Sequence, residues 1–213
     1  MSKNFSLGKF NREHSGNDLR VILFVSRNKD NSHLDSFKER KKAFLAYLNG
    51  YNIPEWLEEE FNDFVSKGQF TEMCRMYISV NARDPDKIKK DLAVELIQDP
   101  GGIDLTKADA IVARAAAHDK NKRSDQKRWL FDWDRPIITQ TEDQLFNKFC
   151  EYVDGYGGGV TVYPTPHGKA VLAEHGFDTR ELATNYGETA DPKRDALLCR
   201  MWKYNYYNTR KRN

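Results

Sequence analysis

The chain has 213 residues, of which 39% are hydrophobic and 12% aromatic, so it carries enough apolar material for a packed interior and does not have the composition of a disordered protein. Its 34 lysine and arginine residues nearly balance its 32 aspartate and glutamate residues, and a net charge of +2 gives no strong overall field that would attract nucleic acid. Because no apolar run is long enough to span a membrane and the N-terminus is polar, we expect neither a membrane protein nor a secreted one.

The first predicted elements are one strand and two helices. Residues 21–25 form a short apolar run rich in β-branched side chains and are predicted as a buried strand. Residues 36–48 place phenylalanine and leucine at roughly helical spacing, so a helix is predicted there, and the Asn-Gly that follows is its stop signal. Pro54 is predicted to open the next helix, over residues 55–65.

A second strand and two more helices follow. Residues 73–81 alternate in polarity, which puts Arg75 on the polar face of a predicted strand whose other face is apolar. A helix is predicted over residues 86–97 and is stopped by the Asp-Pro-Gly-Gly at 99–102. An alanine-rich stretch predicts another helix over residues 106–118.

The rest of the chain is predicted to be rich in strands. The glycine run at 155–159 is predicted to be a flexible hinge or hairpin tip, because no Gly-Lys-Ser/Thr follows it as in a phosphate-binding loop. The loop at 164–168 is predicted to be a tight turn. The remaining predicted elements are strands at 129–134, 160–163, 170–173 and 195–201, and helices at 141–152 and 178–186.

The cysteines and the local charges narrow the class of protein. The three cysteines are scattered and none has the spacing of zinc ligands, so a reducing cytoplasm is the simplest location. Two basic clusters fit either a nucleic-acid contact or a solvated surface, and the aromatics of the last segment fit either base stacking or packing of a last strand. The cysteines are Cys74, Cys150 and Cys199. The first basic cluster is Lys120, Lys122, Arg123, Lys127 and Arg128, and the second is Arg200, Lys203, Arg210, Lys211 and Arg212. The aromatics of the last segment are Trp202, Tyr204, Tyr206 and Tyr207.

The strongest chemical signal is the pair of acids in the strand at 129–134. Residues two apart project from the same face of a strand, so Asp132 and Asp134 present neighbouring carboxylates, while Phe131 and Trp133 point into the opposite layer. Neighbouring carboxylates repel, and a hard divalent cation that also takes phosphate oxygens is the commonest way to keep both ionised. One interpretation of the pattern is therefore a metal site for phosphoryl or nucleotidyl transfer.

On the pair of acids alone, a purely structural role is the favoured interpretation. They then cap a turn or pair with Arg128 and Arg135 at the end of the strand. A third carboxylate would favour the metal site, and Asp195 is the candidate, because it begins an apolar strand that can lie beside the aspartate strand in an antiparallel sheet.

Between about residues 73 and 201 the chain resembles the archaeo-eukaryotic primase superfamily, which includes the primase-polymerases. The resemblance rests on the order of four short motifs: Arg75-x-Tyr77-Ile78-Ser79-Val80-Asn81-x-Arg83-Asp84, Leu130-Phe131-Asp132-Trp133-Asp134, Thr165-Pro166-His167-Gly168 and Lys193-Arg194-Asp195-Ala196-Leu197-Leu198. It implies that Asp132, Asp134 and Asp195 are catalytic and bind two Mg²⁺ or Mn²⁺ ions. It implies nucleotide contacts for Arg75, Asn81, Arg83, Thr165, His167 and Lys169.

The motif around His167 has two registers. Thr165-Pro166-His167 fits the family's Ser/Thr-x-His motif literally, and its histidine contacts the phosphates of the incoming nucleotide. Viral members often read Thr-Pro-x-Gly-x-His, and in that register the histidine position is occupied by Ala170. The second register implies weakened nucleotide positioning, for which His167 or Lys169 would substitute only in part.

Together these observations predict an α+β fold, a mostly antiparallel sheet with packed helices in a primase-polymerase-like core of two interlocked subdomains, residues 1–125 and 126–213. The resemblance implies a metal-dependent nucleotidyltransferase that acts in DNA replication, takes nucleoside triphosphates and a single-stranded nucleic-acid template, and is similar to small viral or mobile-element members. The alternatives are a catalytically weakened relative that binds nucleic acid or a nucleotide, and a metal-dependent phosphoesterase.

Overall fold

The computed structural model of the chain describes residues 16–98, 107–123, 125–134, 139–187 and 192–207. The fold is α+β with antiparallel strand pairs, as predicted, and the chain divides into two compact units. The first unit contains Met1–Met76, Ala82–Lys122 and Lys203–Asn213, and the second contains Tyr77–Asn81 and Arg123–Trp202. The strands β3 (Met73–Ser79) and β7 (Leu197–Tyr204) therefore each contribute residues to both units.

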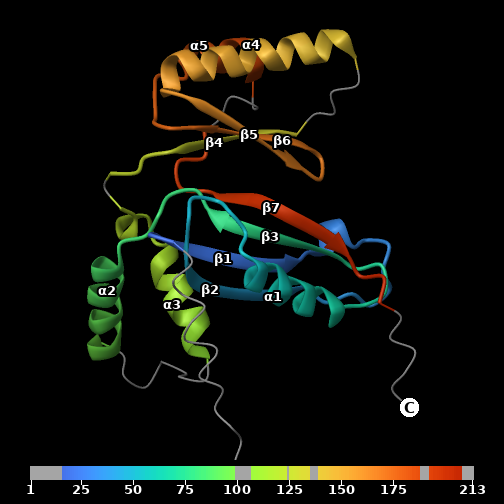
Figure 1. Cartoon of the computed structure of the whole chain (residues 1–213), viewed down its shortest axis with the longest axis vertical. Helices are drawn as coiled ribbons and strands as arrows, with labels where there is room; N and C mark the ends of the chain where they lie inside the picture. Colours follow the sequence, from blue (N-terminus) through green and yellow to red (C-terminus); the bar gives the residue numbers. More distant parts are fainter. Residues whose placement is uncertain (1–15, 99–106, 124, 135–138, 188–191, 208–213) are drawn as a thin grey trace, which may run out of the picture. The chain divides into compact units, whose positions relative to one another are not determined.

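The first unit contains β1 and β2 whole and parts of β3 and β7, and these strands form a four-stranded sheet in the order β2-β1-β3-β7 (Figure 1). The strands β1 (Asp18–Ser26) and β2 (Arg40–Leu48) are antiparallel, with Ile22 opposite Phe44. The helix predicted over residues 36–48 is therefore wrong. Side chains of β2 pack on both faces of the sheet, so its apolar residues do not alternate with polar ones and their spacing imitates that of a helix.

Helices cover both faces of β1. The helix α1 (Glu55–Ser66), which begins after Pro54 as predicted, packs on one face, with the ring centroids of Phe24 and Phe61 5.2 Å apart. Val21 faces the other way and joins a hydrophobic cluster with residues of α2 (Pro85–Gln98) and α3 (Ala108–Ala117). Two short 3-10 turns, η2 (Asn28–Asp30) and η4 (Asp119–Asn121), complete this unit.

The second unit is built on a three-stranded antiparallel sheet in the order β4-β6-β5, with α4 and α5 along one face (Figure 1). Its core is aromatic because the residues of β4 and β6 that face the helices meet aromatic side chains of α4: Phe131, Trp133, Phe146, Phe149, Val153, Val171, Ala173 and Leu182 form the buried cluster. The elements are β4 (Trp129–Trp133), α4 (Gln140–Gly157), β5 (Val160–Thr165), β6 (Gly168–Ala173) and α5 (Arg180–Tyr186).

The glycine run at 155–159 is not the predicted hinge or hairpin tip. The helix α4 runs to Gly157, and Gly158 ends it with a φ of 71° in the left-handed region, where glycine is favoured. A Cβ at Gly158 would also meet the ring of His175, an exposed side chain that would have to move aside.

The strands β5 and β6 form a hairpin whose turn is only two residues long. Thr165 pairs with Gly168, so Pro166 and His167 make the turn and the predicted loop at 164–168 is mostly strand. The other predicted strands and helices are confirmed as elements, with ends that differ by a few residues. The helix stop predicted at 99–102 lies outside the described residues. Within the described part of the chain, no helix has the length and apolar character needed to cross a membrane.

Candidate functional site

Asp132 lies near the end of β4, and Asp134 directly follows the strand. Phe131 and Trp133 are buried in the aromatic core, as predicted, which directs Asp132 to the opposite face of the sheet. The Asp132 side chain is 32% exposed, and Asp134 is exposed immediately after the strand ends. Both carboxylates therefore remain accessible to water and small ions.

The partner of Asp132 is a lysine. An isolated antiparallel bridge joins Leu130 to Lys193 through two backbone hydrogen bonds of 3.1 and 2.8 Å, and the Lys193 Nζ donates to Oδ2 of Asp132. The predicted alternative, pairing with Arg128, does not occur, because Arg128 Nε donates to Oε2 of Glu174 at 2.7 Å. Arg135 lies outside the described residues.

Asp195 belongs to the same segment as Lys193, which runs antiparallel to β4. Residues 194 and 195 form a turn directly after this isolated bridge, and among the described residues no strand pairing joins Asp195 to β4. The predicted convergence of Asp195 with Asp132 and Asp134 stays a prediction. Across the residues that the structure describes, no three His, Cys, Asp or Glu side chains gather closely enough to hold one metal ion. If a hard cation bound at this strand end, the carboxylates of Asp132 and Asp134 would supply oxygen ligands, and Lys193 would have to release Asp132.

Ala170 lies directly opposite Asp132 in the pairing of β4 with β6, and Tyr163 of β5 lies opposite Ala170. The three residues therefore form one row across the face of the sheet that carries Asp132. Arg200 of β7 approaches this row, with its guanidinium carbon 4.3 Å from the centroid of the Tyr163 ring. The row thus contains a carboxylate, a small methyl group and an aromatic ring covered by a cation.

The predicted nucleotide contacts of the hairpin lie on different sides of it. His167 is exposed in the two-residue turn, next to Thr165 at the end of β5. Lys169 is paired with Trp133 and so lies on the face covered by the helices, with its Nζ 4.4 Å from the centroid of the Phe146 ring. The Lys169 side chain therefore lies on the opposite face of the sheet from Asp132.

Arg75, predicted on a polar strand face, is buried and ion-paired within the first unit. Its Nη2 donates to Oδ1 of Asp30, and Arg27 Nε donates to Oδ2 of the same carboxylate at 2.8 Å. Burial alone would raise the pKa of Asp30, but the hydrogen bond from Arg27 and the charge of Arg75 outweigh it and hold the pKa below its ordinary value. The arrangement is that of a stabilising ion-pair network.

Asn81 and Arg83 are also buried. Asn81 is used as a backbone clamp of the second unit: its Nδ2 donates to the carbonyl oxygens of Arg128 and Arg194, and its Oδ1 accepts from the Arg128 amide at 2.8 Å. Arg83 forms a β-bridge with Lys122 in the first unit, and the neighbouring Asp84 caps the start of α2. Asn81 thus fixes the start of β4 beside the segment that carries Lys193.

The sequence did not predict that Lys193 and Arg200 lie near Asp132 and Tyr163. Lys193 was quoted only as part of the motif before Asp195, and Arg200 only as part of a basic cluster. Lys193 is identified by its bridge to Leu130 of β4, and Arg200 by its contact with Tyr163 of β5. Both contacts join residues that are distant in the chain, so no local sequence pattern predicts them.

Comparison with known proteins adds no relative: no family model matches the chain, and neither the curated proteins nor the solved structures contain a match.

Proposed function

We propose that the chain is a metal-dependent nucleotidyltransferase of primase-polymerase type, which joins nucleotides on a single-stranded nucleic-acid template. The observation that carries the proposal is the position of two carboxylates at one strand end: Asp132 on the face of β4 away from α4 and α5, and Asp134, which is exposed directly after the strand. Two divalent ions bound there would lower the pKa of the attacking 3′-hydroxyl and offset the charge of the leaving pyrophosphate. We propose a reducing cytoplasm as the location of this activity, on the scattered cysteines of the sequence.

The cations around this row support a phosphate substrate. Lys193 neutralises Asp132 in the absence of substrate, and its flexible ammonium group can transfer to a phosphate oxygen when a divalent cation takes the carboxylate. The guanidinium of Arg200, over the Tyr163 ring, suits two phosphate oxygens at once. These residues would bind and orient the triphosphate, which is the contribution that positioning makes to phosphoryl transfer.

A catalytically weakened relative that binds a nucleotide or nucleic acid is the second candidate, and Ala170 is the observation that favours it. In the Thr-Pro-x-Gly-x-His register Ala170 occupies the histidine position, and it lies directly across from Asp132. A methyl group donates no hydrogen bond to a phosphate, so the face beside the acids lacks that contact. Under this candidate Lys193 and Arg200 bind phosphate and turnover is slow or absent.

A primer-extension assay separates these candidates. The protein is incubated with Mn²⁺ or Mg²⁺, labelled nucleotides and a primed single-stranded template. Under the proposal, Asp132→Asn and Asp134→Asn each reduce extension at least about a hundredfold, because each removes a charge that holds the metal. The matched control is Asp154→Asn, an exposed acid of α4, which should extend like the unmodified protein.

Each outcome of this assay decides something. Equal extension by all variants would overturn the metal site. No extension by the unmodified protein, with nucleotide binding that is lost on Arg200→Ala, would support the second candidate. Release of free phosphate or nucleotide without extension would instead identify a phosphoesterase.

A further inference from the structure

The guanidinium of Arg194 lies over an aromatic ring at the start of β4, in the second unit. Its central carbon is 5.1 Å from the centroid of the Trp129 ring, and the residue is exposed. Within the described part of the chain, this guanidinium donates no hydrogen bond and forms no ion pair. A guanidinium that stacks on a ring keeps its N–H groups at its edge, where two of them can donate to one phosphate. Arg194 therefore presents donors that the protein itself does not use.

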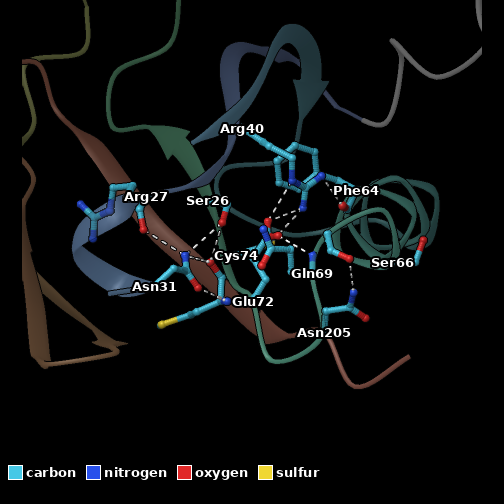
Figure 2. Close-up of polar contacts among 12 residues, drawn as sticks. Ser26, Arg27, Asn31, Arg40, Phe64, Ser66, Gln69, Glu72, Cys74 and Asn205 are labelled. Carbon is cyan, nitrogen blue, oxygen red and sulfur yellow. Dashed lines mark hydrogen bonds and ion pairs between the residues drawn. The ribbon is translucent and has the colours of Figure 1, made fainter. Parts of the chain in front are cut away.

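Another stacked arginine shows what a structural role looks like. Arg40 of the first unit lies over the Phe64 ring, with its central carbon 4.5 Å from the centroid. Its Nε donates to Oε1 of Glu72 at 2.9 Å and its Nη1 to the Phe64 carbonyl at 3.1 Å, so its donors are engaged inside the protein (Figure 2). Arg194 has the same kind of stacking and lacks such acceptors. The acceptor that it suits therefore comes from outside the chain.

The backbone that carries Arg194 is fixed by its neighbours. The buried Asn81 donates from Nδ2 to the Arg194 carbonyl at 3.1 Å and to the Arg128 carbonyl at 3.2 Å. One residue earlier, Lys193 exchanges two backbone hydrogen bonds with Leu130. A fixed backbone reduces the conformational entropy that is lost when a ligand binds. The turn at residues 194 and 195 is thus a preformed support for the exposed guanidinium.

The ring beneath the guanidinium is fixed as well. The Trp129 ring packs on that of Phe177, with the centroids 6.0 Å apart and the planes 31° from parallel. The backbone at Gly176 approaches the same indole so closely that a Cβ there would stand 2.3 Å from the ring carbon Cζ2. Trp129 is therefore held between neighbours and gives Arg194 a rigid surface on which to stack.

The cations near Arg194 differ in whether the protein neutralises them. Arg128 and Lys193, on the two segments that Asn81 joins, each donate to a carboxylate of the second unit. Lys127, which precedes Arg128, is exposed and has no ion pair among the residues that the structure describes. The charges of Arg194 and Lys127 are therefore not balanced locally, and they favour an anionic ligand at this end of β4.

The position of Arg194 selects the kind of anion. Trp129 packs against the helix-covered core, whereas Asp132 lies on the opposite face and about 10 Å further along β4, at about 3.3 Å per residue. A nucleic-acid strand carries a phosphate at every nucleotide and can extend from the acids to this end of the strand. We propose that Arg194 binds a backbone phosphate of a single-stranded nucleic acid. The choice of this ligand rests on the proposed function, which requires a template.

The test is fluorescence anisotropy with a labelled oligothymidylate over a series of salt concentrations, in EDTA so that metal binding plays no part. Each phosphate contact to a single strand contributes about 0.7 to the slope of the logarithm of the binding constant against that of the salt concentration. Arg194→Met should therefore lower the slope by about 0.7 and weaken binding about tenfold at low salt. Arg194→Lys should keep the slope, because it keeps the charge, and lose about threefold in affinity without the planar fork.

The matched control is another exposed arginine of the same unit. Arg180 of α5 has a side chain that is 90% exposed and pairs with Asp178, so Arg180→Met should change neither the slope nor the affinity. Circular dichroism checks that each variant is folded. The same slope and affinity for Arg194→Met as for the unmodified protein, or no strand binding by the unmodified protein, would overturn the inference.

A nucleoside triphosphate distinguishes the two sources of phosphate. Its affinity in Mn²⁺ should be the same for Arg194→Met as for the unmodified protein, because the acids and Arg194 lie on opposite faces of β4. A loss of affinity confined to the triphosphate would overturn the inference, since Arg194 would then hold the incoming nucleotide.

This inference and the proposed catalysis can fail separately. Strand binding that depends on Arg194, with no primer extension by any protein, would support the inference while the catalysis fails. Extension that depends on Asp132, with an unchanged salt slope in Arg194→Met, would support the catalysis and overturn the inference.

Discussion

The ion pair of Arg40 with Glu72 in the first unit and that of Lys193 with Asp132 in the second differ in their exposure to water. The Glu72 side chain is 2% exposed, whereas that of Asp132 is 32% and that of Lys193 is 54% exposed. The buried pair has further hydrogen bonds from the backbone and cannot separate without leaving a charge in the interior. The exposed pair can open into water at little cost, which leaves its carboxylate available for another cation.

The largest expected effect is on the buried pair. Glu72→Gln should lower the free energy of unfolding by about 2 kcal/mol, because the buried charged acceptor of both Arg40, itself 27% exposed, and the Gln69 amide is lost. Urea unfolding followed by circular dichroism measures the change. Asp63→Asn is the matched control, since its pair with Lys67 on α1 is exposed and should contribute about 0.5 kcal/mol or less. An equal loss of unfolding free energy in the two variants would contradict the larger contribution expected of the buried pair.

The next effect concerns Asp30 and is pH-dependent. Asp30→Asn should cost about 2 kcal/mol at neutral pH, because Arg27 and Arg75 both donate to this carboxylate. The pKa of Asp30 is lower in the folded protein, so its contribution is complete above the unfolded value of about 3.9 and is lost as the pH falls through the folded value. The difference between the unfolding free energies of the two proteins should therefore shrink below about pH 4. If this difference in unfolding free energy grew as the pH fell, the lowered pKa of Asp30 in the folded protein would be contradicted.

The smallest effect on stability is expected at the exposed pair. Lys193→Met should change the free energy of unfolding by about 0.5 kcal/mol or less, because the Lys193 side chain is more than half exposed and the Asp132 carboxylate stays accessible to water. Under the proposed function it should also tighten Mn²⁺ binding several-fold, since the cation no longer competes with an ammonium group for Asp132. Calorimetric titration with Mn²⁺ measures this change, and Lys148→Met on α4 is the control. Unchanged or weaker Mn²⁺ binding would argue against competition at this carboxylate.

Helices and strands that have a clear local sequence pattern were predictable. Pairings between residues that are distant in the chain were not. The apolar run of β1 and the alternation of β3 gave the correct strands, and Pro54 marked the start of α1. The strand β2 was predicted as a helix because both of its faces are covered, which removes the alternation that identifies a strand.

The candidate site shows the same limit. That Asp132 turns away from the core follows from the period of a strand, and the burial of Phe131 and Trp133 confirms that part. Lys193 becomes its partner because Lys193 forms a β-bridge with Leu130, 63 residues earlier in the chain. No local sequence pattern predicts such a pairing. Arg75 was expected on a polar face, and its burial depends on Arg27 and Asp30, which come from another part of the chain.

The passage of β3 and β7 through both units has a consequence for how the protein is made. The backbone hydrogen bond between Thr71 and Asn205 joins residues far apart in the sequence, so the first unit can close only after residue 205 has left the ribosome. Until then the edge of β3 has no β7 beside it, and a chain that stops short of β7 keeps this open edge. Neither unit can therefore be excised as one continuous piece, and truncation from the C-terminal side should yield aggregating fragments instead of a stable smaller domain.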